Sequence, residues 1–152
     1  NNNIITPPTL KSRCLNYKIS LTHKDSLFIT SKLINDDISN LIDFELINNY
    51  STPGEILKII RFSQEYKVDI KNIDLKSFLS MIIKNKFYKK EKSVNDLIYS
   101  FIELYFRNNS SNKNFDLLYL YKYFLKKIYN AKNYNLDSEA LFMEFEYRVL
   151  RG

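Results

Sequence analysis

The sequence predicts an all-α fold. Only two glycines and three prolines occur among 152 residues, which argues against a hairpin-rich β protein and against a glycine-rich phosphate-binding loop. Apolar residues recur with the period of an amphipathic helix in segment after segment. We expect the helices to stack as antiparallel hairpins in a short α-solenoid of about three two-helix repeats, with an irregular helix bundle as the alternative.

The chain divides into a lead-in and a helical domain. Residues 1–22 have no periodic apolar face and are expected to be extended or partly disordered, although residues 15–21 alternate like a single strand. Residues 23–152 are expected to form the helical domain. The chain begins at Asn1 rather than at methionine, which favours a fragment of a longer protein.

Three helices are expected in the first half of this domain. Two less cleanly separated helices run from Asp25 to Ile34 and from Asp36 to Asn48. The third runs from Thr52 to about Lys67. It opens on a capping box of Thr52 and Glu55, with a proline at the first helical position.

Four more helices are expected in the second half, each opened by a side chain that can cap its first turn. The expected caps are Asp74, Ser93, Asn114 and Asp137. The helix from Asn114 to Asn130 has an expected core stripe of Leu117, Leu118, Tyr121, Phe124, Leu125 and Ile128. Helix starts recur at intervals of about forty residues, which is typical of a repeat of two helices.

Composition disfavours catalytic, metal-binding and membrane-spanning functions. With a single cysteine, Cys14, and a single histidine, His23, the chain has no internal disulfide and no Cys/His zinc site. A hydrolytic triad needs a histidine beside its nucleophile, and His23 lies at the edge of the lead-in. No apolar run approaches the roughly 18 residues of a membrane span. We expect a non-enzymatic intracellular protein without cofactor or membrane partner.

The positive charge lies in the second half of the chain. Residues 1–75 carry nine Lys or Arg and nine Asp or Glu, whereas residues 76–152 carry fourteen against eight. A positive field concentrated on one region attracts polyanions such as nucleic acid. Alternatively, the lysines keep a helical surface rich in tyrosine and phenylalanine soluble.

Two regions are candidates for RNA binding. On the helix from Asn114 to Asn130, lysines and tyrosines alternate on the face opposite the core stripe. Lysines bind phosphates, and bases stack on tyrosine rings. Its candidate residues are Tyr119, Lys122, Tyr123, Lys126 and Asn130. The second region is the basic run from Lys84 to Lys92, an expected phosphate-contacting loop. Its candidate residues are Lys84, Lys86, Tyr88, Lys89, Lys90 and Lys92.

The helix from Asp137 to Leu150 has a second apolar stripe beside its expected core stripe. This second stripe comprises Ala140, Met143, Tyr147 and Leu150. A helix that is apolar on two sides is typical of an inner solenoid helix, whereas a terminal helix has a polar outer face. We expect the stripe to bind a partner protein, an adjoining repeat or a second copy, unless it folds back onto the N-terminal segment.

Three segments resemble the pentatricopeptide repeat family. Residues 53–66 resemble the second helix of a repeat, residues 75–83 the first helix and residues 138–146 again the second. The resemblance covers roughly residues 36–150. It implies a helical-repeat protein that tracks single-stranded RNA, usually in mitochondria or plastids. The family selects bases through a polar residue after the first-helix aromatic. Here Leu79 follows Phe78, so backbone tracking is implied.

Two classes of function follow. The first is an RNA-binding helical-repeat segment similar to organellar RNA-processing or translation factors. The second is a protein-interaction scaffold or a virus-type helical adaptor, in which the aromatic-rich helices dock a partner. Salt-dependent binding of single-stranded RNA separates the two classes.

Overall fold

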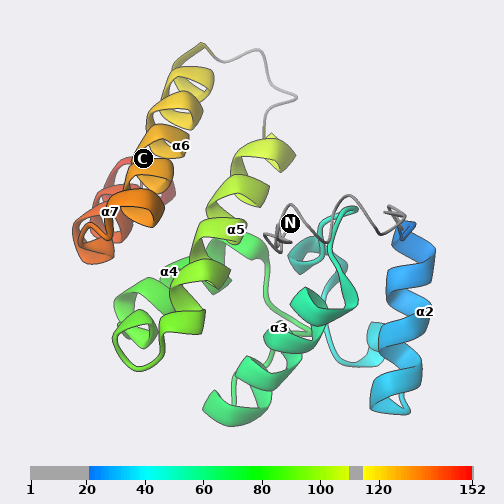
Figure 1. Ribbon diagram of the computed structural model, residues 1–152. Coiled ribbons are helices and arrows are strands. Elements are labelled where there is room, and N and C mark those ends of the chain that lie inside the picture. The colour runs from blue at the N-terminus through cyan, green and yellow to red at the C-terminus, as the bar shows by residue number, and fades with distance from the viewer. Residues whose placement is uncertain (1–20, 110–114, 152) are drawn as a thin grey trace, which may run out of the picture.

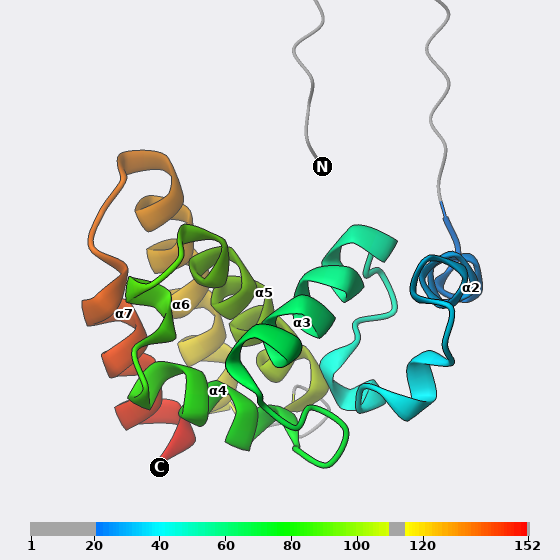
Figure 2. The same ribbon diagram turned by 90° about the horizontal axis from the view of Figure 1, so that it is seen from below.

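A computed structural model describes residues 21–109 and 115–151, and all regular secondary structure in these ranges is helical, without a strand. The α-helices are α2 (His23–Ile34), α3 (Pro53–Tyr66), α4 (Leu75–Lys84), α5 (Lys92–Asn109), α6 (Phe115–Tyr134) and α7 (Ser138–Phe145). Short turns of 3₁₀-helix are η1 (Ile38–Asn40), η2 (Phe44–Leu46) and η3 (Phe87–Lys89), and η4 (Glu146–Leu150) is a π-helical turn. Figures 1 and 2 show α2 at one end of the molecule and α6 and α7 at the other, with α3, α4 and α5 between them.

Polar side chains fix most of the helix starts. Thr52 and Glu55 form the expected capping box of α3, and Thr22 and Asp25 form a second one at α2. The expected caps of α4 and α7 are also confirmed, because Asp74 and Asp137 each accept a hydrogen bond from a first-turn backbone N–H. These caps satisfy donors that the helical ladder leaves open.

The helix expected from Asp36 to Asn48 is wrong. This stretch contains only η1 and η2, and two aspartates explain the break. Asp37 Oδ1 accepts from the Ser39 N–H at 3.0 Å, and Asp43 Oδ1 accepts from the Glu45 N–H at 2.8 Å. The backbone N–H of Asp43 also bonds the Ile70 carbonyl at 2.8 Å. Such local bonds compete with a continuous helix.

Several other expected boundaries are revised or lie outside the described residues. Helix α5 begins at Lys92, and the Ser93 hydroxyl donates to the Glu91 carboxylate rather than capping the helix. The cap expected at Asn114, all but the last residue of the strand expected over residues 15–21, and the lead-in up to residue 20 fall outside the described ranges. Described Leu21 is not in a strand.

One continuous core joins the helices. Phe106 of α5, Phe124 of α6 and Phe145 of α7 pack with ring centroids 5.3–6.0 Å apart. Helix α4 joins the same core through Phe78, whose ring lies 5.1 Å from that of Phe101. Aromatic pairs at these separations stabilise a core beyond the apolar area that they bury.

The last helix returns to the elements that follow α4. The ring of Tyr88, in η3, lies 5.1 Å from that of Phe142 in α7, and η4 contacts α4. In consequence α7 lies between α6 on one side and the basic turn η3 on the other. None of the helices in the described ranges is long and apolar enough to cross a membrane.

The core face of α6 is rotated from the expected one. Leu118, an expected core residue, is 49% exposed, whereas Leu120 and Ala131 pack into the core instead. The reason is the position of α7, which packs on the side of α6 that carries Tyr123 and Lys127. The buried side of α6 is therefore shifted toward these two residues, and the exposed side is shifted away from them.

Candidate nucleic-acid interface

The outer face of α6 carries two tyrosines that flank two lysines. Tyr119 and Tyr129 are 65% and 63% exposed, and Lys122, Lys126 and Asn133 are exposed between and beyond them. At 3.6 residues per turn these five positions lie in one row along the helix. We call this row the α6 outer face. It combines the expected residues Tyr119, Lys122 and Lys126 with two that were not expected there, Tyr129 and Asn133.

No carboxylate belongs to the α6 outer face, and no described residue forms an ion pair with Lys122 or Lys126. Exposed lysines of this kind are available to polyanions, because no carboxylate of the described chain pairs with them. Of the expected interface residues on α6, Tyr119, Lys122 and Lys126 are exposed and form no ion pair with a described residue.

Tyr123 belongs to the contact between α6 and α7. It is half-buried, and its hydroxyl donates to Glu144 Oε1 at 2.8 Å. Lys127 pairs with the other oxygen of the same carboxylate, and Arg148 Nη1 lies 2.9 Å from Glu144 Oε1. Partial burial alone raises the pKa of Glu144, but the hydrogen bonds from Lys127, Tyr123 and Arg148 outweigh it and lower the pKa to about 2.

Asn130, the remaining candidate on α6, is half-buried. It lies between the α6 outer face and the side of the helix that α7 covers. The rotation of the core face that exposes Leu118 thus also partly removes Asn130 and Tyr123 from the surface.

Carboxylates of α7 and η4 neutralise much of the basic run from Lys84 to Lys92. Lys86 and Lys89 lie 3.2 and 2.7 Å from the Glu139 carboxylate, and Lys84 lies 3.9 Å from Glu146. Hydrogen bonds from Lys89 and then Lys86 lower the pKa of Glu139. The run therefore stabilises the return of α7 as well as supplying positive charge.

Two residues of the same run, Tyr88 and Lys90, make aromatic contacts within the protein. Tyr88 is buried beneath α7, and desolvation together with the charge of Glu139 raises its pKa to about 12. The ammonium group of Lys90 lies 5.2 Å from the ring centroid of Tyr66 and 4.9 Å from that of Phe87. The side chain of Lys92 lies outside what the structure describes.

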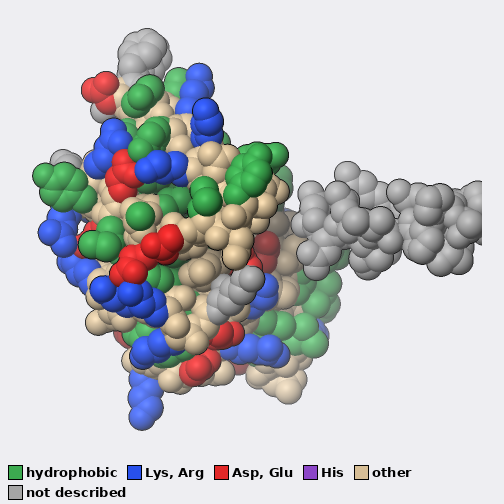
Figure 3. All heavy atoms as spheres, turned by 60° about the vertical axis from the view of Figure 1, so that its left-hand side comes forward, with side chains coloured by type: hydrophobic (Ala, Val, Ile, Leu, Met, Phe, Trp, Pro, Cys, Tyr) green, Lys and Arg blue, Asp and Glu red, His purple; other side chains and the backbone are tan. Residues whose placement is uncertain are grey.

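The second apolar stripe of the C-terminal helix is exposed only in part. Ala140, Met143 and Tyr147 face solvent, with Met143 54% and Tyr147 74% exposed. Leu150 is buried, so its expected place in an exposed stripe is wrong; the π-helical turn η4 directs it into the core. Figure 3 shows this side of the molecule, where apolar side chains lie among lysines, arginines and carboxylates.

Within the two described ranges, no group of three or more His, Cys, Asp or Glu side chains lies close enough to hold a metal ion. His23 stands at the start of α2, and Cys14 lies outside the described residues.

The chain matches no protein-family model, no curated protein and no solved structure.

Proposed function

We propose that this protein is a non-enzymatic binder of single-stranded RNA that uses the α6 outer face. One observation carries the proposal: exposed Tyr119 and Tyr129 flank exposed Lys122 and Lys126, which form no ion pair with a described residue, on a face without carboxylates. Tyrosine rings stack on bases of any identity, and lysines contact the phosphates between them.

The dimensions of the face suit a short stretch of single strand. Tyr119 and Tyr129 are ten residues apart, which corresponds to about 15 Å along the helix axis. The face offers only one amide, that of Asn133, for hydrogen bonding to base edges. The expected binding mode is therefore tolerant of sequence and dependent on salt.

The resemblance to pentatricopeptide repeats points the same way. It extends the proposal to a role like that of mitochondrial RNA-processing or translation factors, and to helices stacked as repeats. The contacts of α4 with α5, of α5 with α6 and of α6 with α7 are of the kind that stacked helical hairpins make.

The test is fluorescence anisotropy with a labelled single-stranded RNA twelve-mer. The variant Lys122→Glu with Lys126→Glu should bind at least tenfold more weakly, and its salt slope should be shallower by about 1.4 because two phosphate contacts are lost. The matched control, Lys24→Glu with Lys71→Glu, makes the same charge change at exposed sites elsewhere.

Equal losses in the two double variants would mean that net charge alone attracts the RNA. Absence of binding at low salt would contradict the proposal outright.

A protein-interaction scaffold is the second candidate, and the exposure of Met143 and Tyr147 on α7 favours it. Large apolar side chains grouped on a surface are typical of a protein contact. Here Met143→Glu with Tyr147→Glu should abolish capture of a partner at high salt, whereas the double lysine variant of α6 should not.

A further inference from the structure

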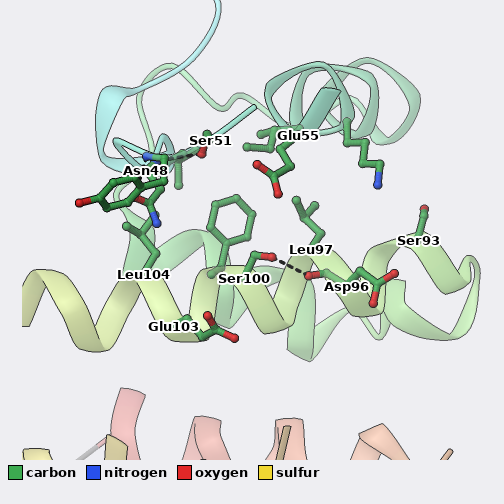
Figure 4. A pocket seen from close by; sticks show the side chains of 14 residues that line it. Asn48, Ser51, Glu55, Ser93, Asp96, Leu97, Ser100, Glu103 and Leu104 are labelled. Atoms are coloured by element: carbon green, nitrogen blue, oxygen red, sulfur yellow. Dashed lines mark hydrogen bonds between the residues drawn. The ribbon is translucent and has the colours of Figure 1, made fainter. Parts of the chain in front are cut away.

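A groove with an apolar floor runs along the seam between α3 and α5. It consists of two adjoining cavities of about 260 and 230 Å³, which share Lys58, Ser93 and Leu97 in their walls. Figure 4 shows the larger cavity, with Glu55 above it and the side chains of α5 below. Helix α6 packs against the opposite side of α5 through Phe106, so the groove is separate from the α6 outer face.

The floor and the rim of the larger cavity differ in chemistry. Buried Ile59, Phe101 and Leu104 contribute to an apolar floor. Asp96 and Glu103 stand on the α5 side of the rim. The groove therefore offers apolar contact at depth and negative charge at its edge.

The two α5 carboxylates of the rim take part in no salt bridge within the described chain. Neither Asp96 nor Glu103 has a salt bridge to a described residue, although Glu103 is half-buried. Glu55, on the α3 side, uses one carboxylate oxygen in the capping box of Thr52. Lys58 is the single cation in the wall of the larger cavity. A net negative edge stands out in a chain of net charge +6.

We propose that this groove binds a segment of another protein in which an aliphatic residue lies between lysines or arginines. The aliphatic side chain enters the larger cavity, and the cations meet Asp96 and Glu103. The larger cavity, of about 260 Å³, has room for an aliphatic side chain. Asp96 and Glu103 are about 10 Å apart along α5. Two residues three apart in a polyproline-II segment span about 9 Å.

The test uses a fluorescein-labelled nonapeptide of three Lys-Leu-Ser repeats, with Glu-Leu-Ser and Lys-Ser-Ser repeats as controls. We expect Glu103→Gln to weaken binding of the Lys-Leu-Ser peptide roughly tenfold, because a contact between charged groups is lost. Glu45→Gln removes an exposed carboxylate outside the groove and should change the affinity less than twofold. Ser100→Arg places a cation inside the groove and should abolish binding.

Circular dichroism melting shows whether the Ser100→Arg variant folds. If it does not fold, the peptide affinity of Glu103→Gln alone tests the proposal. An unchanged affinity in Glu103→Gln overturns the proposal, as does equal binding of the Lys-Ser-Ser peptide, which lacks an anchor. Self-association of the wild-type chain that Glu103→Gln abolishes would make a second copy the occupant and would also overturn it. Binding of RNA is independent of every one of these outcomes.

Discussion

The hydroxyl of Tyr123 donates a hydrogen bond to Glu144 Oε1 across 2.8 Å and joins α6 to α7. Lys127 and Arg148 pair with the same carboxylate. Lys127 Nζ and Arg148 Cζ also lie 4.8 and 5.0 Å from the centroid of the Tyr123 ring. One carboxylate thus gathers three donors from two helices. In consequence Tyr123 and Lys127 stabilise the packing of α7 and are not free to contact a ligand.

Glu144 makes the stability of this contact dependent on acid pH. Its pKa lies at about 2 in the folded chain against an ordinary 4.5. The unfolded chain therefore binds the proton first, and the stabilisation is present above pH 4.5 and lost as pH falls toward 2. Glu144→Gln should cost about 1–2 kcal/mol at pH 7. Urea unfolding at pH 7 and pH 3 should show a difference between wild type and variant that shrinks at pH 3.

Tyr88 should behave as a core residue rather than as a contact for RNA. Its ring is buried against Phe142, whereas its hydroxyl makes only a long bond of 3.4 Å to Glu139. Tyr88→Phe should change the free energy of unfolding by less than about 1 kcal/mol, and Tyr88→Ala should cost about 3–5 kcal/mol through a cavity. Thermal melts measure both. RNA affinity that drops in a fully folded Tyr88→Phe would contradict this assignment.

Substitutions in the C-terminal stripe should differ in how much stability they cost. Leu150 is buried and Met143 is half exposed, so Leu150→Ala should cost about 2–5 kcal/mol and Met143→Ala less than about 1 kcal/mol. Urea denaturation of the two single variants gives the comparison. Equal losses would mean that Met143 packs within the chain as well.

The sequence predicted helices well where a cap and an apolar stripe agreed. In α3 the capping box, the proline at the first position and the apolar residues Ile56, Ile60 and Phe62, which are buried, all favour the same helix. In the stretch from Asp36 to Asn48 the buried residues Ile38, Ile42 and Leu46 also recur every four positions. There the interrupting aspartates bind the backbone locally, and the apolar period alone could not reveal it.

The sequence predicted which helix carries the candidate interface but not which side of that helix faces solvent. The lysines and tyrosines of α6 could be identified from the sequence, but which of the tyrosines are exposed depends on where α7 packs. Nothing in the sequence of α6 signals that Glu144 will take up Tyr123 and Lys127. Likewise the groove between α3 and α5 arises from residues some forty positions apart, such as Glu55 and Asp96, so no local pattern could indicate it.

The final prediction concerns stacking on the α6 outer face. Tyr119→Ala and Tyr129→Ala should each weaken binding of single-stranded RNA by about 1–3 kcal/mol, because each removes a ring on which a base stacks. Tyr134→Ala is the matched control, since Tyr134 is 70% exposed at the end of the same helix but lies off this face. Phenylalanine at position 119 or 129 should retain most of the affinity, because the ring rather than the hydroxyl makes the contact. Anisotropy titrations at one fixed salt concentration provide the measurement. If Tyr134→Ala loses as much affinity as Tyr129→Ala, the RNA does not follow the row from Tyr119 to Asn133, and the α6 outer face is not its binding surface.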